Sequence, residues 1–243
     1  MTRAPTRFRQ AAAMAFEGFS KDFFKFFRDL KKHNDREWFE ANKDRYKALV
    51  VAPMSDFIAE LAPLLAKTSP NFTCDPRPNG GSMFRIYRDV RFSKNKEPYK
   101  THASAHFRHA AGKDVHAPGY YLHLAPGQVL FGGGMYMPEP PALAKIRTRI
   151  AEKPADWKKA RDAASIKKTY GGITSRDALT KAPRGFNPEH PMIEDIKRKS
   201  FFVGCDSDEA AAASPTFPKT VAKAYADAAP LMQFLCVSVG VKY

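Results

Sequence analysis

Apolar residues recur at helical spacing in the first third of the chain. A stripe from Phe19 to Leu30, with Ser20 as a good helix N-cap, predicts a helix over about Lys21–Lys32. Two more helical stripes follow, from Trp38 to Val50 and from Phe57 to Leu65, and Pro53 interrupts between them. We therefore expect a block of amphipathic helices at this end of the protein.

The hydrophobic period changes to two in the middle of the chain, which indicates half-buried strands. The first of these strands is predicted over Phe84–Tyr87, and a second over Thr101–Arg108. A third strand, Tyr120–Leu124, is expected to pair with Gln128–Phe131 as a hairpin across Ala125-Pro126-Gly127. The connections are too short for crossover helices, so the strands should form an antiparallel meander.

The last part of the chain is again mostly helical, with an extended segment at Phe201–Val203 and a final helix over about Lys219–Leu235. We predict a single α+β domain over residues 16–243, with an antiparallel meander flanked by N-terminal and C-terminal helices. Residues 1–15 carry three arginines and are expected to form a flexible basic arm.

The run Gly132-Gly133-Gly134 stands between a predicted strand and a predicted helix, the order found in phosphate-cradling loops. Its spacing matches neither GxGxxG nor GxxxxGK[ST], so it is a poor nucleotide signature. Alternatively, the glycines permit a bulge or a close approach of two backbones. Both interpretations stay open, and the sequence predicts no cofactor.

The net charge of the chain indicates which classes of binding partner are favoured. The chain has 40 Lys and Arg against 25 Asp and Glu, a net charge of +15, which favours polyanions, anionic surfaces or anionic metabolites. Cys74, Cys205 and Cys236 form no CxxC pair, which argues against a zinc ribbon and a disulfide framework. No apolar run approaches a membrane span in length, so we expect a cytoplasmic protein with no membrane partner.

The segment Arg85–His106, RIYRDVRFSKNKEPYKTHASAH, holds six Lys or Arg against Asp89 and Glu97. Arginine presents a planar fork that suits phosphate and carboxylate groups, so an excess of cations here predicts an anion pocket. Cationic surroundings should lower the pKa of His102 and His106 and keep them neutral. The predicted ligand-binding residues are Arg85, Tyr87, Arg88, Asp89, Arg91, Lys96, Tyr99, Lys100, His102 and His106.

The same segment has two other interpretations. Asp89 could bridge neighbouring arginines in an ion-pair network that organises the turn and binds nothing. A metal site is less favoured, because no HExxH or comparable pattern appears and the local positive charge opposes a cation. We therefore predict no metal and assign no catalytic residue. The histidines and carboxylates weighed as ligands are His102, His106, His109, His116, Asp89 and Asp114.

Nucleic-acid binding is the main alternative function. Lys145–Lys168 contains nine Lys or Arg against three acidic residues, which suits phosphate contacts. No helix-turn-helix, zinc-finger or RNP-type signature accompanies it. A non-catalytic module that docks a partner on a Phe-rich face is a third alternative. The preferred prediction is binding, with or without transformation, of a small phosphorylated or carboxylated metabolite in an Arg/Lys/His-lined pocket.

Four blocks of the sequence resemble a known family. They are FFKFFRDLKKHNDREWFEANKDRY, FRIYRDVRFSKNKEPYKTH, PGYYLHLAPGQVLFGGGMYMP and APRGFNPEHP. They are similar to successive blocks of domain-of-unknown-function family 2461, over roughly residues 17–240. The resemblance implies a single α+β domain found in bacteria and fungi, and it supplies no catalytic residues. Asn95 stands where relatives often carry Asp in the FSKDK turn, so a mechanism that needs a carboxylate there is in doubt.

Overall fold

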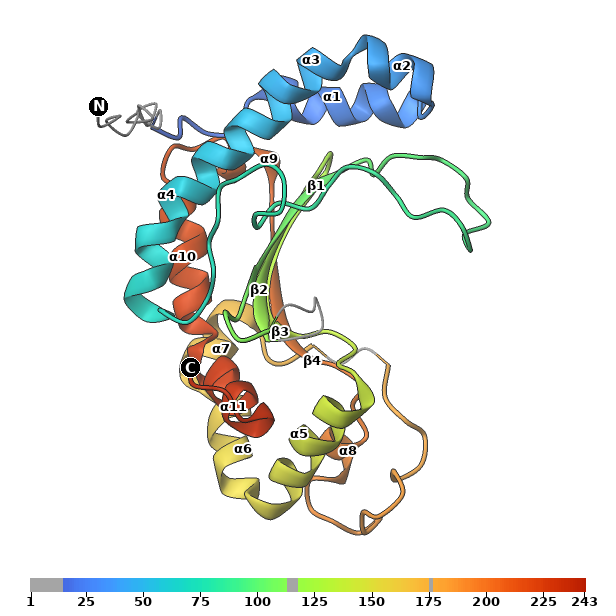
Figure 1. The fold of residues 1–243 in the computed structure, drawn as a ribbon. Coiled ribbons are helices and arrows are strands. Elements are labelled where there is room, and N and C mark those ends of the chain that lie inside the picture. The colour runs from blue at the N-terminus through green and yellow to red at the C-terminus, as the bar shows by residue number, and fades with distance from the viewer. Residues whose placement is uncertain (1–14, 113–117, 175–176) are drawn as a thin grey trace, which may run out of the picture.

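The computed structural model describes residues 15–112, 118–174 and 177–243. These residues form an open, four-stranded antiparallel sheet flanked by helices (Figure 1), which confirms the predicted α+β class and the meander. Only the last residue of the predicted basic arm lies within the described ranges. In order across the sheet, the strands are β1 (Ala103–Arg108), β2 (Gly119–Ala125), β3 (Gln128–Met135) and β4 (Phe201–Ser207).

The N-terminal helices begin as predicted. The side chain of Ser20 caps α1 by accepting a hydrogen bond from the Phe23 backbone N–H at 3.2 Å. The expected interruption at Pro53 is wrong, because a π-helical turn carries the chain directly into α4, where Pro53 lies in the first turn and its missing N–H is tolerated. These elements are α1 (Lys21–Lys32), α2 (Arg36–Ala41), α3 (Lys43–Tyr46), η1 (Lys47–Val51) and α4 (Ala52–Thr68).

The C-terminal half adds further helices around β4. The predicted final helix is two helices, because α10 ends before Ala228 and α11 starts anew with Pro230 in its first turn. The elements are α5 (Pro140–Glu152), α6 (Pro154–Arg161), α7 (Ala164–Tyr170), α8 (Ile193–Ile196), α9 (Glu209–Ala212), α10 (Phe217–Asp227) and α11 (Ala229–Val239).

The two faces of the sheet have different surroundings. Helices α4 and α10 pack side by side over one face (Figure 1), and Phe107, Leu122 and Phe131 of the strands are buried there. Alternate residues of the same strands, such as His106 and Tyr121, point to the opposite face. In the described part of the chain no helix lies across that second face (Figure 1), so the sheet keeps one open side.

The helical stretch Lys43–Thr68 is long and apolar enough to cross a membrane by composition alone. Its apolar side is nevertheless covered by protein, since Phe57 and Leu61 are fully buried. The Phe57 ring lies 5.7 Å from the Phe217 ring of α10, centroid to centroid. We therefore treat the stretch as a core helix, for which such a composition is ordinary.

The run Gly132–Gly134 lies inside β3 and is not a loop before a helix. It pairs with residues 202–204 of β4. A Cβ on Gly132 would collide with the backbone carbonyl of Val203, and a Cβ on Gly133 would lie 2.7 Å from the Tyr120 ring. Of the two interpretations of this run, close backbone packing is confirmed.

Replacing Gly132 with Ala should lower the free energy of unfolding by about 2 kcal/mol or more, because β4 must move to admit the methyl group. The matched control is Gly204→Ala at the cross-strand partner position, where a Cβ would meet nothing within 4 Å. This control should change the stability by less than about 0.5 kcal/mol. Urea unfolding measures both variants, and equal losses would contradict the packing argument.

Candidate functional site

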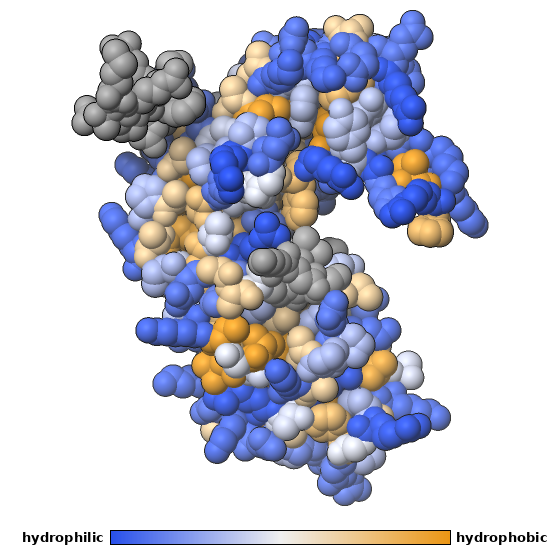
Figure 2. Space-filling model, viewed as in Figure 1, coloured by the Kyte–Doolittle hydropathy of each residue, from blue (hydrophilic) through white to orange (hydrophobic). Residues whose placement is uncertain are grey.

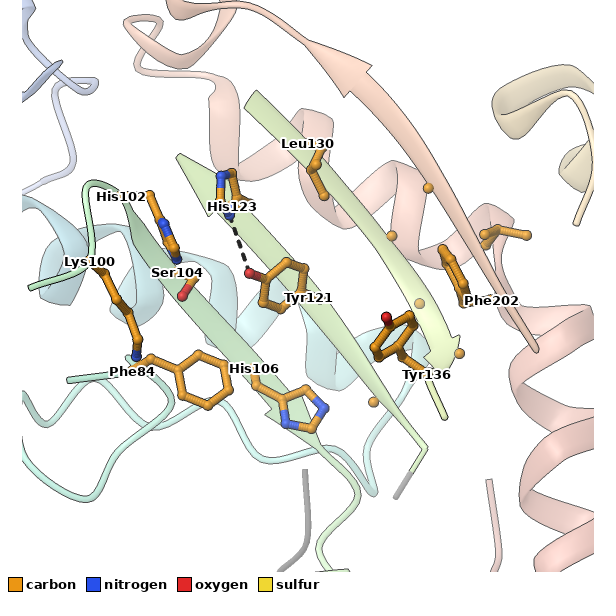
Figure 3. Close-up of a pocket in the computed structure, with 16 residues that line it drawn as sticks. Phe84, Lys100, His102, Ser104, His106, Tyr121, His123, Leu130, Tyr136 and Phe202 are labelled. Carbon is orange, nitrogen blue, oxygen red and sulfur yellow. Dashed lines mark hydrogen bonds between the residues drawn. The ribbon is translucent and has the colours of Figure 1, made fainter. Parts of the chain in front are cut away.

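The open face of the sheet carries a cavity of about 610 Å³, in the hollow that Figure 2 shows between the two ends of the molecule. Figure 3 shows the side chains that line it. Glycines and apolar side chains of β3 and β4 form one end, and polar groups of β1, β2 and the segment before β1 form the other. The polar groups are Lys100, His102, Ser104, His106, Tyr121 and His123.

Strand register brings these polar groups together. Ser104 pairs with His123, and His106 pairs with Tyr121. Side chains of directly paired residues on one face of a sheet lie about 5 Å apart. In Figure 3 the Ser104 and Tyr121 hydroxyl groups and the His102 ring point toward one another. The Tyr121 hydroxyl also lies 3.3 Å from Nδ1 of His123, within hydrogen-bond distance.

Two of the three histidines at the polar end, His102 and His123, are neutral near physiological pH. The pKa of His102 is lowered to about 4, mainly by burial and in smaller part by neighbouring His123 and Lys100. Burial also lowers the pKa of His123. The two imidazole centroids are 4.3 Å apart, a contact that disfavours charging either ring. The expected direction for His102 is therefore found, with burial rather than positive charge as the largest cause.

Lys100 lies at the edge of this polar group. Its Nζ donates a hydrogen bond to the Arg85 carbonyl oxygen at 2.7 Å and lies 5.3 Å from the centroid of the Phe84 ring. Burial, followed by the Arg85 charge, lowers the pKa of Lys100. Among the described residues that line the cavity, Lys100 is the only lysine or arginine, and none carries a carboxylate.

Residues 85–100 form a finger that extends from the sheet (Figure 1). The strand predicted at Phe84–Tyr87 is an extended ribbon with isolated bridges and no regular ladder, such as the bridge between Tyr87 and Tyr99. Asn34 holds its base, because its side-chain amide donates to the Tyr99 carbonyl at 3.0 Å and accepts from the Tyr99 N–H at 3.1 Å. The finger is thereby tied to the turn between α1 and α2.

Most cations of the finger have partners within it. Arg91 pairs with Asp89 at 2.7 Å, which lowers the pKa of that carboxyl to about 2. Arg88 donates to the Glu97 carbonyl at 3.0 Å and lies 3.6 Å from its carboxylate. Lys96 donates to the Val90 carbonyl at 3.1 Å. These contacts organise the turn, as the ion-pair interpretation described.

The structure divides the ten predicted ligand-binding residues into two groups. Lys100, His102 and His106 line the cavity. The others lie on the finger and outside the cavity lining, and their role in binding stays a prediction. They are Arg85, Tyr87, Arg88, Asp89, Arg91, Lys96 and Tyr99.

Sequence reasoning missed Tyr121 and His123 as site residues. The sequence pattern contained the information, because Tyr121 and His123 alternate with the apolar residues of β2 and therefore share one face. Their pairing with β1 required the register between the two strands, which no short turn fixes. The described part of the connection runs over residues 109–112 and 118, between β1 and β2.

Metal ligation was also weighed for the histidines. Among the described residues no group of three or more His, Cys, Asp or Glu could hold a metal ion. His109 forms a hydrogen bond instead, since its Nε2 lies 2.7 Å from the Lys242 carbonyl oxygen. Asp114 and His116 lie outside the described residues.

Acid should destabilise the protein through His102. Its pKa falls from 6.5 to about 4 on folding, so below about pH 6.5 the unfolded chain binds a proton that the folded protein does not. The stabilisation is complete above that pH and is lost as the pH falls toward 4. In the His102→Asn variant, the free energy of unfolding should fall by about 1–2 kcal/mol less than in the unmodified protein as the pH is lowered to about 4. This range allows for the partial exposure of the His102 ring. Urea unfolding across this range measures it, and parallel curves for both proteins would contradict it.

Comparison with known proteins assigns the family. No curated protein and no solved structure matches the chain. The model of a family described as a conserved hypothetical protein matches residues 22–234, most of the chain. The four sequence blocks that resemble this family all fall within that span. The chain therefore belongs to domain-of-unknown-function family 2461.

Proposed function

We propose that this is a cytoplasmic protein whose open-face cavity binds a small organic anion, such as a carboxylated or phosphorylated metabolite. The observation that carries the proposal is the charge of the cavity lining, where Lys100 stands without any carboxylate among the described lining residues. The Lys100 ammonium group is half-buried and has no ionised partner among the described residues, which favours an anionic ligand.

Neutral hydrogen-bond donors near Lys100 would orient the bound anion. The hydroxyl groups of Ser104 and Tyr121 and one N–H of each neutral imidazole can donate to oxygen atoms of a bound acid. The site thus differs from the arginine-rich pocket expected from the sequence. It offers one point charge and several hydrogen-bond donors on rigid strands, an arrangement suited to a compact head group.

The polar end offers little for covalent catalysis. No cysteine is among the described residues that line the cavity. Elsewhere, burial raises the pKa of Cys74 and Cys236 to about 12 and of Cys205 to about 11, so these thiols stay protonated and weakly nucleophilic near neutral pH. A histidine whose pKa is about 4 is a weak general base at neutral pH. Binding is therefore the function that we propose, without a reaction.

Lys100→Gln should weaken the binding of propionate and of inorganic phosphate by about 10-fold, the equivalent of about 1.4 kcal/mol, because the compensating charge is gone. Chemical-shift perturbation in NMR titrations suits such weak ligands. It should map to His102, Ser104 and Tyr121.

The matched control for this titration is Lys96→Gln, which removes a lysine of the finger outside the cavity lining. It should bind as the unmodified protein does. Equal affinities for all three proteins, or shifts confined to the finger, would rule out the cavity as the anion site.

A second candidate function rests on the tip of the finger. The side chain of Phe92 is 95% exposed, and the Arg91 guanidinium carbon lies 5.8 Å from its ring centroid. Lys94 and Lys96 follow within four residues. An exposed aromatic ring among cations is the element with which single-stranded nucleic acids are bound, by stacking of a base and contact with its phosphates.

Phe92→Ala should therefore weaken binding of a single-stranded oligonucleotide by about 1–3 kcal/mol, the range of one stacked base. The dependence of the affinity on salt should persist, because the cations remain. Filter binding across a salt series measures both quantities. Val237→Ala on α11 is the control, since Val237 is also exposed and lies outside the finger. An unchanged affinity of the Phe92→Ala variant for the oligonucleotide would rule out the finger as a nucleic-acid-binding element.

A further inference from the structure

The cavity has a second end with a different construction. We call it the bare end and define it by Gly132, Gly134 and Gly204, with Leu130, Tyr136 and Phe202 around them. Across the sheet, His106 pairs with Tyr121, Tyr121 with Gly132, and Gly132 with Gly204. One row of the open face therefore changes from ring side chains on β1 and β2 to naked backbone on β3 and β4.

The floor of the bare end is made of peptide groups. Gly204 is the informative position, because a Cβ there would meet nothing within 4 Å and would project into the cavity. At Gly132, in contrast, the backbone of β4 occupies the place of a Cβ. Packing therefore excludes a side chain at Gly132, whereas at Gly204 the space is open and the absence of a side chain keeps the cavity floor flat.

The walls of the bare end are aromatic on two sides. The rings of Tyr136 and Phe202 meet edge to face at 5.8 Å, and the Tyr121 ring stands on the side of the polar end (Figure 3). Aromatic walls prefer an aromatic guest, because ring edges and faces attract one another through their quadrupoles. A flat floor with such walls fits a planar ring better than a puckered or branched aliphatic group.

The two ends lie within reach of one ligand. Neighbouring strands are about 4.8 Å apart, so a molecule that reaches from β3 to β1 spans about 10 Å. That is the length of an aromatic ring that carries an acid group on a short linker. The cavity of about 610 Å³ has room for a molecule of this size.

We propose that the cavity selects an aromatic acid, with the ring on the β3 side of the glycine floor and the acid group beside Ser104 and Tyr121, where the charge of Lys100 attracts it. The proposal rests on the anion-binding function proposed above and specifies its class of ligand. Aliphatic acids of the same length bind mainly by the head group and gain less at the bare end than an aromatic ring does.

The test compares three acids, 3-phenylpropionate, 3-cyclohexylpropionate and propionate, by calorimetry or NMR titration. On the unmodified protein 3-phenylpropionate should bind at least about 10-fold more tightly than propionate and several-fold more tightly than the cyclohexyl analogue. Gly204→Val places a side chain on the floor. It should reduce the affinity for 3-phenylpropionate to that for propionate and leave propionate binding unchanged.

Two variants accompany Gly204→Val. Asp206→Val carries the same new side chain on the same face of β4 but outside the cavity lining, and it should keep the preference for the phenyl ring. Phe202→Leu removes an aromatic wall without filling the cavity. Phe202→Leu should narrow the difference in affinity between the phenyl and cyclohexyl acids. This variant tests the proposal even if Gly204→Val fails to fold.

The outcomes separate the two proposals. If propionate binds and responds to Lys100→Gln, but the phenyl ring adds no affinity, the aromatic-acid proposal is wrong and the anion site stands. The same conclusion follows if Gly204→Val leaves 3-phenylpropionate binding intact. If none of the three acids binds the unmodified protein, both proposals are wrong.

Discussion

The close approach of β4 to the glycine run of β3 is the constraint on which the rest of the structure depends. Between Gly132 and Val203 the backbones leave no room for even a methyl group. The contact joins the C-terminal half of the chain to the hairpin of β2 and β3, because β4 is the outer strand on that side of the sheet. It also keeps the open face of β3 free of side chains at Gly132 and Gly134, and these positions form part of the cavity floor.

The sheet separates two kinds of environment. On the covered face, aromatic and aliphatic side chains of the strands are buried beneath α10 and its neighbouring helices. On the open face, polar groups of β1 and β2 are partly buried without a helix above them. Burial there favours neutral imidazoles, so the ring pair of His102 and His123 adds donors and acceptors to the site without adding charge.

The positive charge of the chain and the cavity prove to be separate features. Two of the three arginines that make Arg85–His106 conspicuous in sequence, Arg88 and Arg91, pair with Glu97 and Asp89 inside the finger. The cavity takes a single lysine from the end of that segment. A net charge of +15 can draw anions toward the protein from a distance, whereas selection within the cavity depends on Lys100 and on shape.

By itself, the sequence determined the elements and their local pattern. Period-two alternation located β1, β2 and β3, because residues that alternate between core and solvent leave that trace in any strand. The same alternation placed His102, Ser104 and His106 on one face. It could not show that Tyr121 and His123 join them, or that the glycines of β3 lie against β4, since register and long-range pairing follow from contacts between distant segments. Only the tertiary structure decided which face of the sheet the helices cover, and that choice determined where the cavity lies.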